Sequence, residues 1–99
     1  MATVNIVFAQ VGGAGIDSRL GVYQGHGAES EDITSSASSQ QSTGVAKDQT
    51  FIRVTTTGGA IRILTGVNPT ALTSSILVLD DTTMDLAVRK GDKIAVIDN

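Results

Sequence analysis

The chain of 99 residues has no cysteine, no tryptophan and a single histidine, His26. Without cysteine it can form neither a disulfide framework nor a thiolate metal site. One imidazole is one ligand, whereas a zinc site takes three or four ligands from the protein. We therefore expect no catalytic residues, no bound metal and no other cofactor, and a binding or assembly role rather than an enzyme.

Aromatic residues are also scarce, since Phe8, Tyr23 and Phe51 are the only ones. Large rings bury the most area per side chain. A core built instead from Val, Ile, Leu and Ala is thin, which is one reason to expect that neighbouring subunits add to its stability. The same scarcity disfavours an aromatic platform for sugar binding.

Charge and hydropathy exclude two classes of partner. The net charge is −3 and the seven Lys and Arg residues are dispersed, so the clustered cations that supply most of the affinity for nucleic acids are missing. No apolar run approaches the ~20 residues of a membrane span, and the start lacks the basic region of a signal peptide. We expect no nucleic acid and no membrane as partner, and a single domain over residues 1–99.

The sequence does contain strand-length apolar runs, and short turn clusters separate them. Gly58-Gly59, Asp80-Asp81 and Lys90-Gly91-Asp92-Lys93 are such clusters, and this alternation is typical of a compact antiparallel domain. No long segment keeps a helical period, and residues 68–75 are the best candidate for a helix of one or two turns. The sequence predicts an all-β fold: a small antiparallel β-sandwich or jelly-roll-like barrel of about six to eight strands, with a long polar arm.

Two of the turn clusters predict hairpins. With Gly58-Gly59 as a two-residue turn, Val54 lies opposite Ile63. Because the side-chain period of a strand is two, this pairing separates two faces. The core face collects Ile52, Val54, Ile61 and Ile63, and the outward face collects Arg53, Thr55, Arg62 and Leu64. With Gly91-Asp92 as the second turn, Leu86 pairs with Ile97 and Val88 with Ala95, while Ala87 pairs with Val96 and Arg89 with Ile94 on the other face.

Residues 24–49 differ in character, because they are rich in Ser, Thr and Gln and have few apolar anchors. Such a segment cannot offset the cost of ordering by its own burial. Two interpretations stay open: a long mobile loop, or an extended arm that lies on another subunit. A structureless loop of this length is unusual inside a small domain.

Several residues are candidates for contacts between subunits. Residues 3–11 form a strand with apolar side chains on both faces, which suggests that it is covered on both sides, by the domain itself or by a neighbour. Val4, Ile6 and Phe8 are our candidates for contact with another subunit, through strand addition. The two arginines Arg53 and Arg62, neighbours on the outward face of the first hairpin, form either a solvated face or a patch for an acidic surface. The acidic residues Glu29, Glu31 and Asp32 are the matching surface in an adjacent copy.

Two other patterns resemble functional motifs without the structural context that they need. Gly12-Gly13-Ala14-Gly15 follows a strand, but no amphipathic helix comes after it, so the helix N-terminus that would bind a dinucleotide phosphate is missing. Asp80, Asp81 and Asp85 do not match the alternating ligands of a calcium loop. We interpret both segments as turns.

Three runs of the chain together form a pattern. They are Ala60-Ile61-Arg62-Ile63-Leu64-Thr65-Gly66-Val67-Asn68-Pro69-Thr70-Ala71, Val88-Arg89-Lys90-Gly91-Asp92-Lys93-Ile94-Ala95-Val96-Ile97 and the polar Ile33-Thr34-Ser35-Ser36-Ala37-Ser38-Ser39-Gln40-Gln41-Ser42. This pattern resembles one in small virion proteins of tailed bacteriophages. The resemblance covers residues 33–98 and is strongest for head decoration (cement) proteins. It implies a non-enzymatic β-sandwich or jelly-roll protein that forms homo-oligomers. Residues 88–94 also resemble the closing strands of cupins, but the metal-binding histidines of cupins have no counterpart here.

From this resemblance we expect a phage capsid decoration protein that bridges neighbouring shell subunits and stabilises the shell. Its expected partners are itself, as a homo-oligomeric dimer or trimer, and the major capsid protein. It would be made in the host cytoplasm and located on the capsid surface of the virion. Alternatives are a head–tail joining or tail-attachment protein, a carbohydrate- or receptor-binding module, and a small hydrolase or isomerase on a jelly roll.

Overall fold

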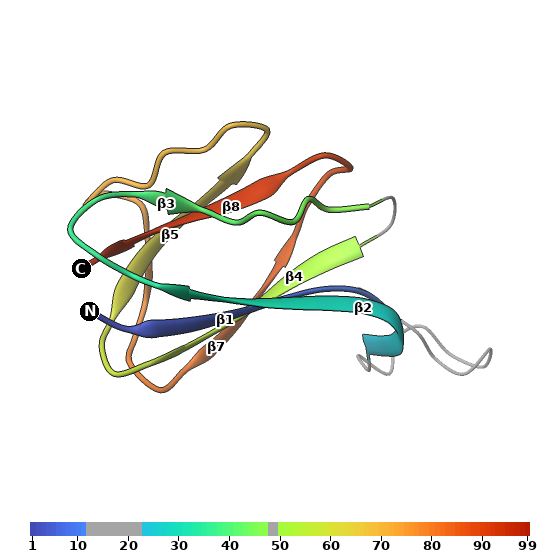
Figure 1. Ribbon diagram of the computed structural model, residues 1–99, viewed down its shortest axis with the longest axis horizontal. Helices are drawn as coiled ribbons and strands as arrows, with labels where there is room; N and C mark the ends of the chain where they lie inside the picture. Colours follow the sequence, from blue (N-terminus) through green and yellow to red (C-terminus); the bar gives the residue numbers. More distant parts are fainter. Residues whose placement is uncertain (12–22, 48–49) are drawn as a thin grey trace.

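A computed structural model describes residues 1–11, 23–47 and 50–99 as strands and connecting segments, with no helix among them. The strands are antiparallel and form two four-stranded sheets, in the orders β2-β1-β4-β7 and β3-β8-β5-β6. Figure 1 shows the two sheets as two layers. The prediction of an all-β antiparallel sandwich is confirmed, and the described strands do not close into a barrel. Their bounds are β1 Thr3–Val11, β2 Tyr23–Thr34, β3 Gln40–Gln41, β4 Thr50–Thr57, β5 Ile61–Gly66, β6 Ile76–Val78, β7 Thr83–Ala87 and β8 Lys93–Asp98.

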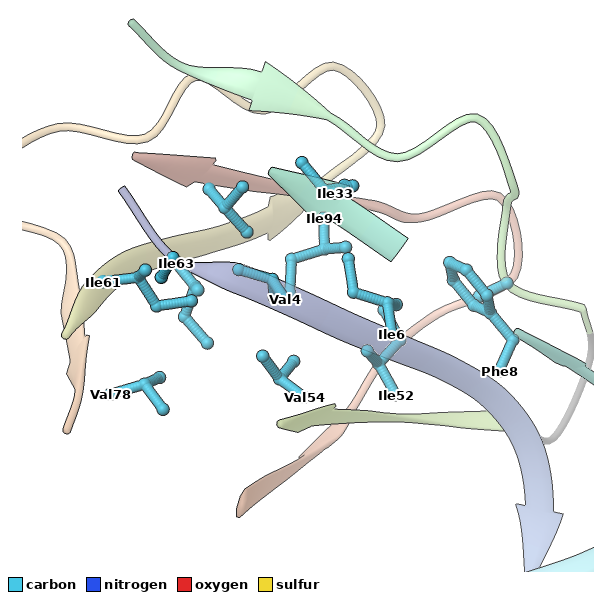
Figure 2. Close-up of a cluster of buried hydrophobic side chains, with 13 residues drawn as sticks. Val4, Ile6, Phe8, Ile33, Ile52, Val54, Ile61, Ile63, Val78 and Ile94 are labelled. Atoms are coloured by element: carbon cyan, nitrogen blue, oxygen red, sulfur yellow. The ribbon is translucent and has the colours of Figure 1, made fainter. Parts of the chain in front are cut away.

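The core lies between the two sheets and consists mainly of Ile and Val side chains (Figure 2). One sheet contributes every second residue of β1 and β4, and the other contributes alternate residues of β5 and β8. β-branched side chains suit this position because they pack well on a pleated surface. Phe8 is the only aromatic residue among them. The fully buried aliphatic residues of this layer include Val4, Ile6, Ile52, Val54, Ile61, Ile63, Val78, Ile94 and Val96.

Neither predicted hairpin forms. β4 pairs with β1 and β7, whereas β5 pairs with β6 and β8, so Gly58-Gly59 connects one sheet to the other. β7 and β8 likewise belong to different sheets. The physical reason is that two strands with one apolar face each can bury those faces by facing each other across the sandwich as well as by lying side by side. Turn residues alone do not distinguish the two arrangements.

The face assignment for the first pair of strands is nevertheless confirmed. Ile52, Val54, Ile61 and Ile63 are fully buried, while Arg53, Thr55, Arg62 and Leu64 point outward. For the second pair the assignment is wrong, because Leu86 and Val88 of one strand pack on the core together with Ile94 and Val96 of the other. The second turn is also shifted by one residue: the N–H of Asp92 donates to the carbonyl of Arg89, so its central residues are Lys90 and Gly91. Gly91 has φ +90°, as the third position of a type II turn requires.

The prediction of a loop or arm for residues 24–49 is wrong for residues 24–34, which form a regular strand. Residues 24–34 belong to β2, which pairs with β1, and residues 35–47 cross to the other sheet, where β3 pairs with β8. Polar side chains can be ordered here because β2 is an edge strand and because hydrogen bonds hold the crossing. Ala46, which is buried, is the apolar anchor that the composition concealed.

Two further predictions concern the glycine-rich turn and the short helix. The Gly12-Gly13-Ala14-Gly15 turn lies outside the described residues. The short helix considered for residues 68–75 is absent, since this segment is an extended connection that ends in a turn in which the N–H of Ser75 donates to the carbonyl of Leu72.

The buried position of Ile63 generates a stability prediction. Replacing Ile63 with Ala leaves a cavity between the sheets and is expected to lower the free energy of unfolding by about 2–5 kcal/mol. The control Leu72→Ala truncates an aliphatic side chain that is 58% exposed and is expected to change it by about 0.5 kcal/mol or less. Urea unfolding measures both, and equal losses would contradict this description of the core.

Candidate functional site

The three apolar residues predicted for strand addition are core residues of the chain itself. Val4 and Ile6 are fully buried and Phe8 is nearly so. β1 is moreover an inner strand, with β2 hydrogen-bonded on one side and β4 on the other, so it offers no free edge. The prediction that Val4, Ile6 and Phe8 contact a neighbouring subunit is therefore wrong. Of the two kinds of cover considered for β1, the domain itself provides the cover of Val4, Ile6 and Phe8.

The acidic residues of β2 have partners within the chain. Both oxygens of Glu31 accept backbone hydrogen bonds, from Thr43 at 3.0 Å and from Gly44 at 2.8 Å, so this carboxylate ties β2 to the crossing segment. A Cβ at Gly44 would lie 3.1 Å from the ring of Phe8, so that a larger residue there would require the ring to shift slightly. Glu29 forms an exposed ion pair with Lys47 at 2.7 Å, and Asp32 accepts from the amide of Asn5 at 2.9 Å.

The two arginines lie on different sheets and are not neighbours, which corrects the predicted patch. Arg53 on β4 forms a two-pronged ion pair with Asp85 of β7, with N–O distances of 2.8 and 3.0 Å. Arg62 on β5 donates to Asn99 and to the backbone carbonyl of Ser75, both at 3.0 Å. Whether Glu29, Glu31 and Asp32 meet these arginines in another copy stays a prediction.

The outer face of the first sheet satisfies its own polar groups. Cross-strand hydrogen bonds join Asn5 to Ser30 and Thr55 to Thr83, and the Arg53–Asp85 pair extends this pattern to the edge. Polar side chains that bind one another across strands stabilise a solvated sheet face. This face therefore has the character of a surface that is in contact with water.

The second sheet presents a different exterior around β5 and β6. Exposed large aliphatic side chains in the described residues are concentrated between positions 64 and 79. This stretch comprises the second half of β5, the connection to β6, β6 itself and the residue that follows β6. The two strands β5 and β6 lie side by side, with Ile63 paired to Ile76 and Ile61 to Val78. Ile76 therefore lies on the core side of the sheet edge, whereas Leu64 points outward. We call this stretch the β5–β6 surface; its exposed members are Leu64, Val67, Leu72, Ile76 and Leu79.

Hydrogen bonds fix the connection that carries half of this surface. The amide of Gln41 donates to the side chain of Asn68 at 2.8 Å and to the carbonyl of Pro69 at 2.7 Å. The N–H of Ala71 donates to the hydroxyl of Ser39 at 2.8 Å. The connection is therefore tied to β3 and the residues before it, and it displays Val67 and Leu72 on a supported backbone.

A second polar cluster joins the two sheets at the chain ends. The hydroxyl of Ser35, which is completely buried, accepts from the N–H of Ala2 at 2.8 Å and donates to the carboxylate of Asp98. The N–H of Ser35 donates to the carbonyl of Ala2, and the N–H of Asp98 donates to the carbonyl of Ser36. This cluster links β1 and β8 through the crossing, and its groups bind one another, which leaves them a structural role.

The described residues were compared with two kinds of site, a metal centre and a membrane span. They contain no group of three or more His, Cys, Asp or Glu side chains that could hold a metal ion. They also contain no helix long and apolar enough to cross a membrane. The side chain of His26 lies outside the described part of the structure.

The β5–β6 surface was not among the residues predicted from sequence. One signal was present, since Ile76-Leu77-Val78-Leu79 has apolar residues at both parities and a strand with one solvated face alternates. Val67 and Leu72 also stand in a segment that Asn68-Pro69 marks as a loop, where large aliphatic residues have no core to fill.

Comparison with protein-family models, with curated proteins and with solved structures gives no match to this chain. The geometry described above therefore carries the functional argument together with the sequence resemblance.

The hydroxyl of Ser35 generates a second stability prediction. In Ser35→Ala the buried N–H of Ala2 loses its acceptor and Asp98 loses a donor, so the free energy of unfolding should fall by about 1–3 kcal/mol. Ser38→Ala removes a hydroxyl from an exposed position of the same segment and should cost about 0.5 kcal/mol or less. Thermal or urea unfolding compares the two, and similar losses would refute the role given to Ser35.

The Arg53–Asp85 pair generates a prediction on pH dependence. The hydrogen bond from Arg53, helped by its charge and opposed by desolvation, lowers the pKa of Asp85 below 3.8. A carboxyl with a lowered pKa adds stability above its unfolded-state pKa and loses it as the pH falls through the folded-state value. In Arg53→Gln the pKa of Asp85 should rise toward 3.8, so the loss of stability on acidification should become smaller.

The carboxyl of Asp85 is followed by NMR titration, with Arg89→Gln as a control that removes an equal charge elsewhere. Because the Asp85 side chain is 49% exposed, the coupling in a double-mutant cycle should be under about 1 kcal/mol. An unchanged titration of Asp85 in Arg53→Gln would show that the pair does not form in solution.

Proposed function

We propose that this protein is a small structural protein of a tailed-phage virion, which decorates the capsid, forms homo-oligomers and bridges neighbouring shell subunits. One observation carries the proposal: five of the seven exposed large hydrophobic side chains of the described residues belong to the β5–β6 surface. Exposed large aliphatic side chains that are concentrated in one part of a soluble domain mark a candidate region for protein contact. The opposite sheet face, with its paired polar side chains, suits exposure to water.

The resemblance of residues 33–98 to phage virion proteins supports the same assignment. Val67 and Leu72 belong to the connection within this region, and their aliphatic side chains would pack against the shell. Each contact would be small, but a decoration protein is repeated over a symmetric lattice, so that weak contacts are multiplied through multivalency. A rigid sandwich with a supported loop also loses little conformational freedom on docking.

The test is co-sedimentation of the purified protein with undecorated capsids of the phage that encodes it. Val67→Lys and Leu72→Lys place a charge at positions that are 75% and 58% exposed, so both variants should fold, yet each should weaken capsid binding roughly tenfold because the charge is desolvated at the contact. Val45→Lys introduces the same charge at an exposed position outside the β5–β6 surface and should bind as the wild type does.

Heat resistance of the particles provides an independent measure, since a bridging protein should raise the temperature at which the shells open. Binding of the wild type to isolated tails or necks in place of shells would favour a head–tail joining or tail-attachment role. Binding to neither, or equal binding by all three lysine variants, would contradict the proposal.

A further inference from the structure

The described strands leave four sheet edges, at β2, β7, β3 and β6. An open edge presents unpaired backbone groups, and proteins guard such edges with charges, proline, glycine or shortness. β2 carries Glu29, Glu31 and Asp32, and β7 carries Asp85 at its centre. β3 is only two residues long and also has the connection tied beside it. β6 is also short, with three residues, but it carries neither a charge nor a proline.

The β6 edge is apolar throughout. Its three residues Ile76, Leu77 and Val78 are flanked by Ser75 and Leu79, so five consecutive residues carry no charge. Ile76, the first residue of β6, is 46% exposed, and Leu79, which follows β6, is 59% exposed. Val78 between them is part of the core. One side of β6 is paired with β5, and no described strand lies on the other side.

We propose that β6 pairs antiparallel with β6 of a second copy of this chain, about a two-fold axis at Leu77, to give one continuous eight-stranded sheet. The inference deepens the proposed function and rests on it, because it names the strand through which neighbouring copies meet. Strand addition of this kind uses backbone hydrogen bonds for affinity and the facing side chains for register.

The register about Leu77 is self-complementary. Ile76 lies opposite Val78 of the second copy on the core side, and Leu79 lies opposite Ser75. Asp80 and Asp81 stand in the turn after β6 and not in the paired strand, so the paired residues themselves carry no charge. The two copies of Arg62, on β5, are separated by three strand spacings, roughly 14 Å, which exceeds the screening length of about 8 Å at physiological salt.

Among the described edges, β6 is the one best suited to pair with a second copy of the chain. Self-pairing at β2 or β7 would bring carboxylates of the two copies close together, which disfavours it. At β6 the facing residues are uncharged and apolar groups cover exposed apolar groups. An edge of this length makes a small contact, so pairing in dilute solution is expected to be weak and to become extensive only at high concentration or on a lattice.

Cysteine trapping tests the axis, because the chain has no cysteine of its own. In Leu77→Cys the two introduced side chains face each other with Cβ atoms about 4.5–5.5 Å apart, close to the separation of a disulfide. In the control Leu79→Cys the two thiols are four residues apart along the paired strands, roughly 13 Å. Position 79 is the more exposed one, so random collisions would cross-link it at least as fast.

With oxidised glutathione as the oxidant, Leu77→Cys should form a covalent dimer at least tenfold faster than Leu79→Cys, seen as a doubling of the 10.2 kDa mass on a non-reducing gel. Equal rates, or a folded Leu77→Cys that stays monomeric with its thiol titratable, would overturn the proposal. Sedimentation equilibrium up to ~1 mM supplies a test without cysteine. The average molecular mass of the wild type and of Val67→Lys should rise with concentration, whereas Leu79→Lys should remain monomeric. Any other outcome for these three proteins also overturns the pairing.

Capsid binding separates this inference from the proposed function. Capsid binding by a wild type that never self-associates would refute the β6 pairing and leave the decoration role intact. Self-association through β6 by a protein that binds no virion component would uphold the pairing and refute the decoration role.

Discussion

The two sheets of this protein are held together by one thin layer of aliphatic side chains, and the rest of the structure depends on that layer. Ile and Val from alternate positions of β1, β4, β5 and β8 meet between the sheets, with Phe8 as the single large ring. β-branched side chains lose little rotamer freedom in strands, so they fill such a layer at low entropic cost. These Ile and Val side chains are committed to the layer, so contacts with other molecules are left to the outer faces and the edges.

The outer faces divide the molecule into two sides of different chemistry. On the first sheet, amides, hydroxyls and the Arg53–Asp85 pair bind one another across strands. On the second, the connection from β5 to β6 is pinned to β3 and displays aliphatic side chains. A domain with one polar side and with exposed aliphatic side chains on the other is suited to lie against the surface of another protein, as the proposed role requires.

Much of the fold follows from the period of two along the chain, and the strand partners do not. Ile52, Val54, Ile61 and Ile63 were recognised as core residues because alternation fixes the face of each strand. The partner of each strand was wrong, since Gly58-Gly59 permits either a hairpin or a step between sheets. β2 was taken for a loop because its side chains are mostly polar, and the burial of Ser35 depends on Ala2 and Asp98, which are distant in the sequence. The β5–β6 surface escaped notice because exposure is decided by the whole fold.

The junction at Ser35 has a consequence for the topology of the chain. Ala2 and Asp98 bind the same hydroxyl, so the two ends of the described chain emerge at one place, as Figure 1 shows. A few glycines joining them would close the backbone into a ring with little distortion, and new ends could then be opened in an exposed turn such as residues 80–82. The sandwich is therefore a natural candidate for circular permutation, in which the order of the strands along the chain changes while their neighbours in space stay the same.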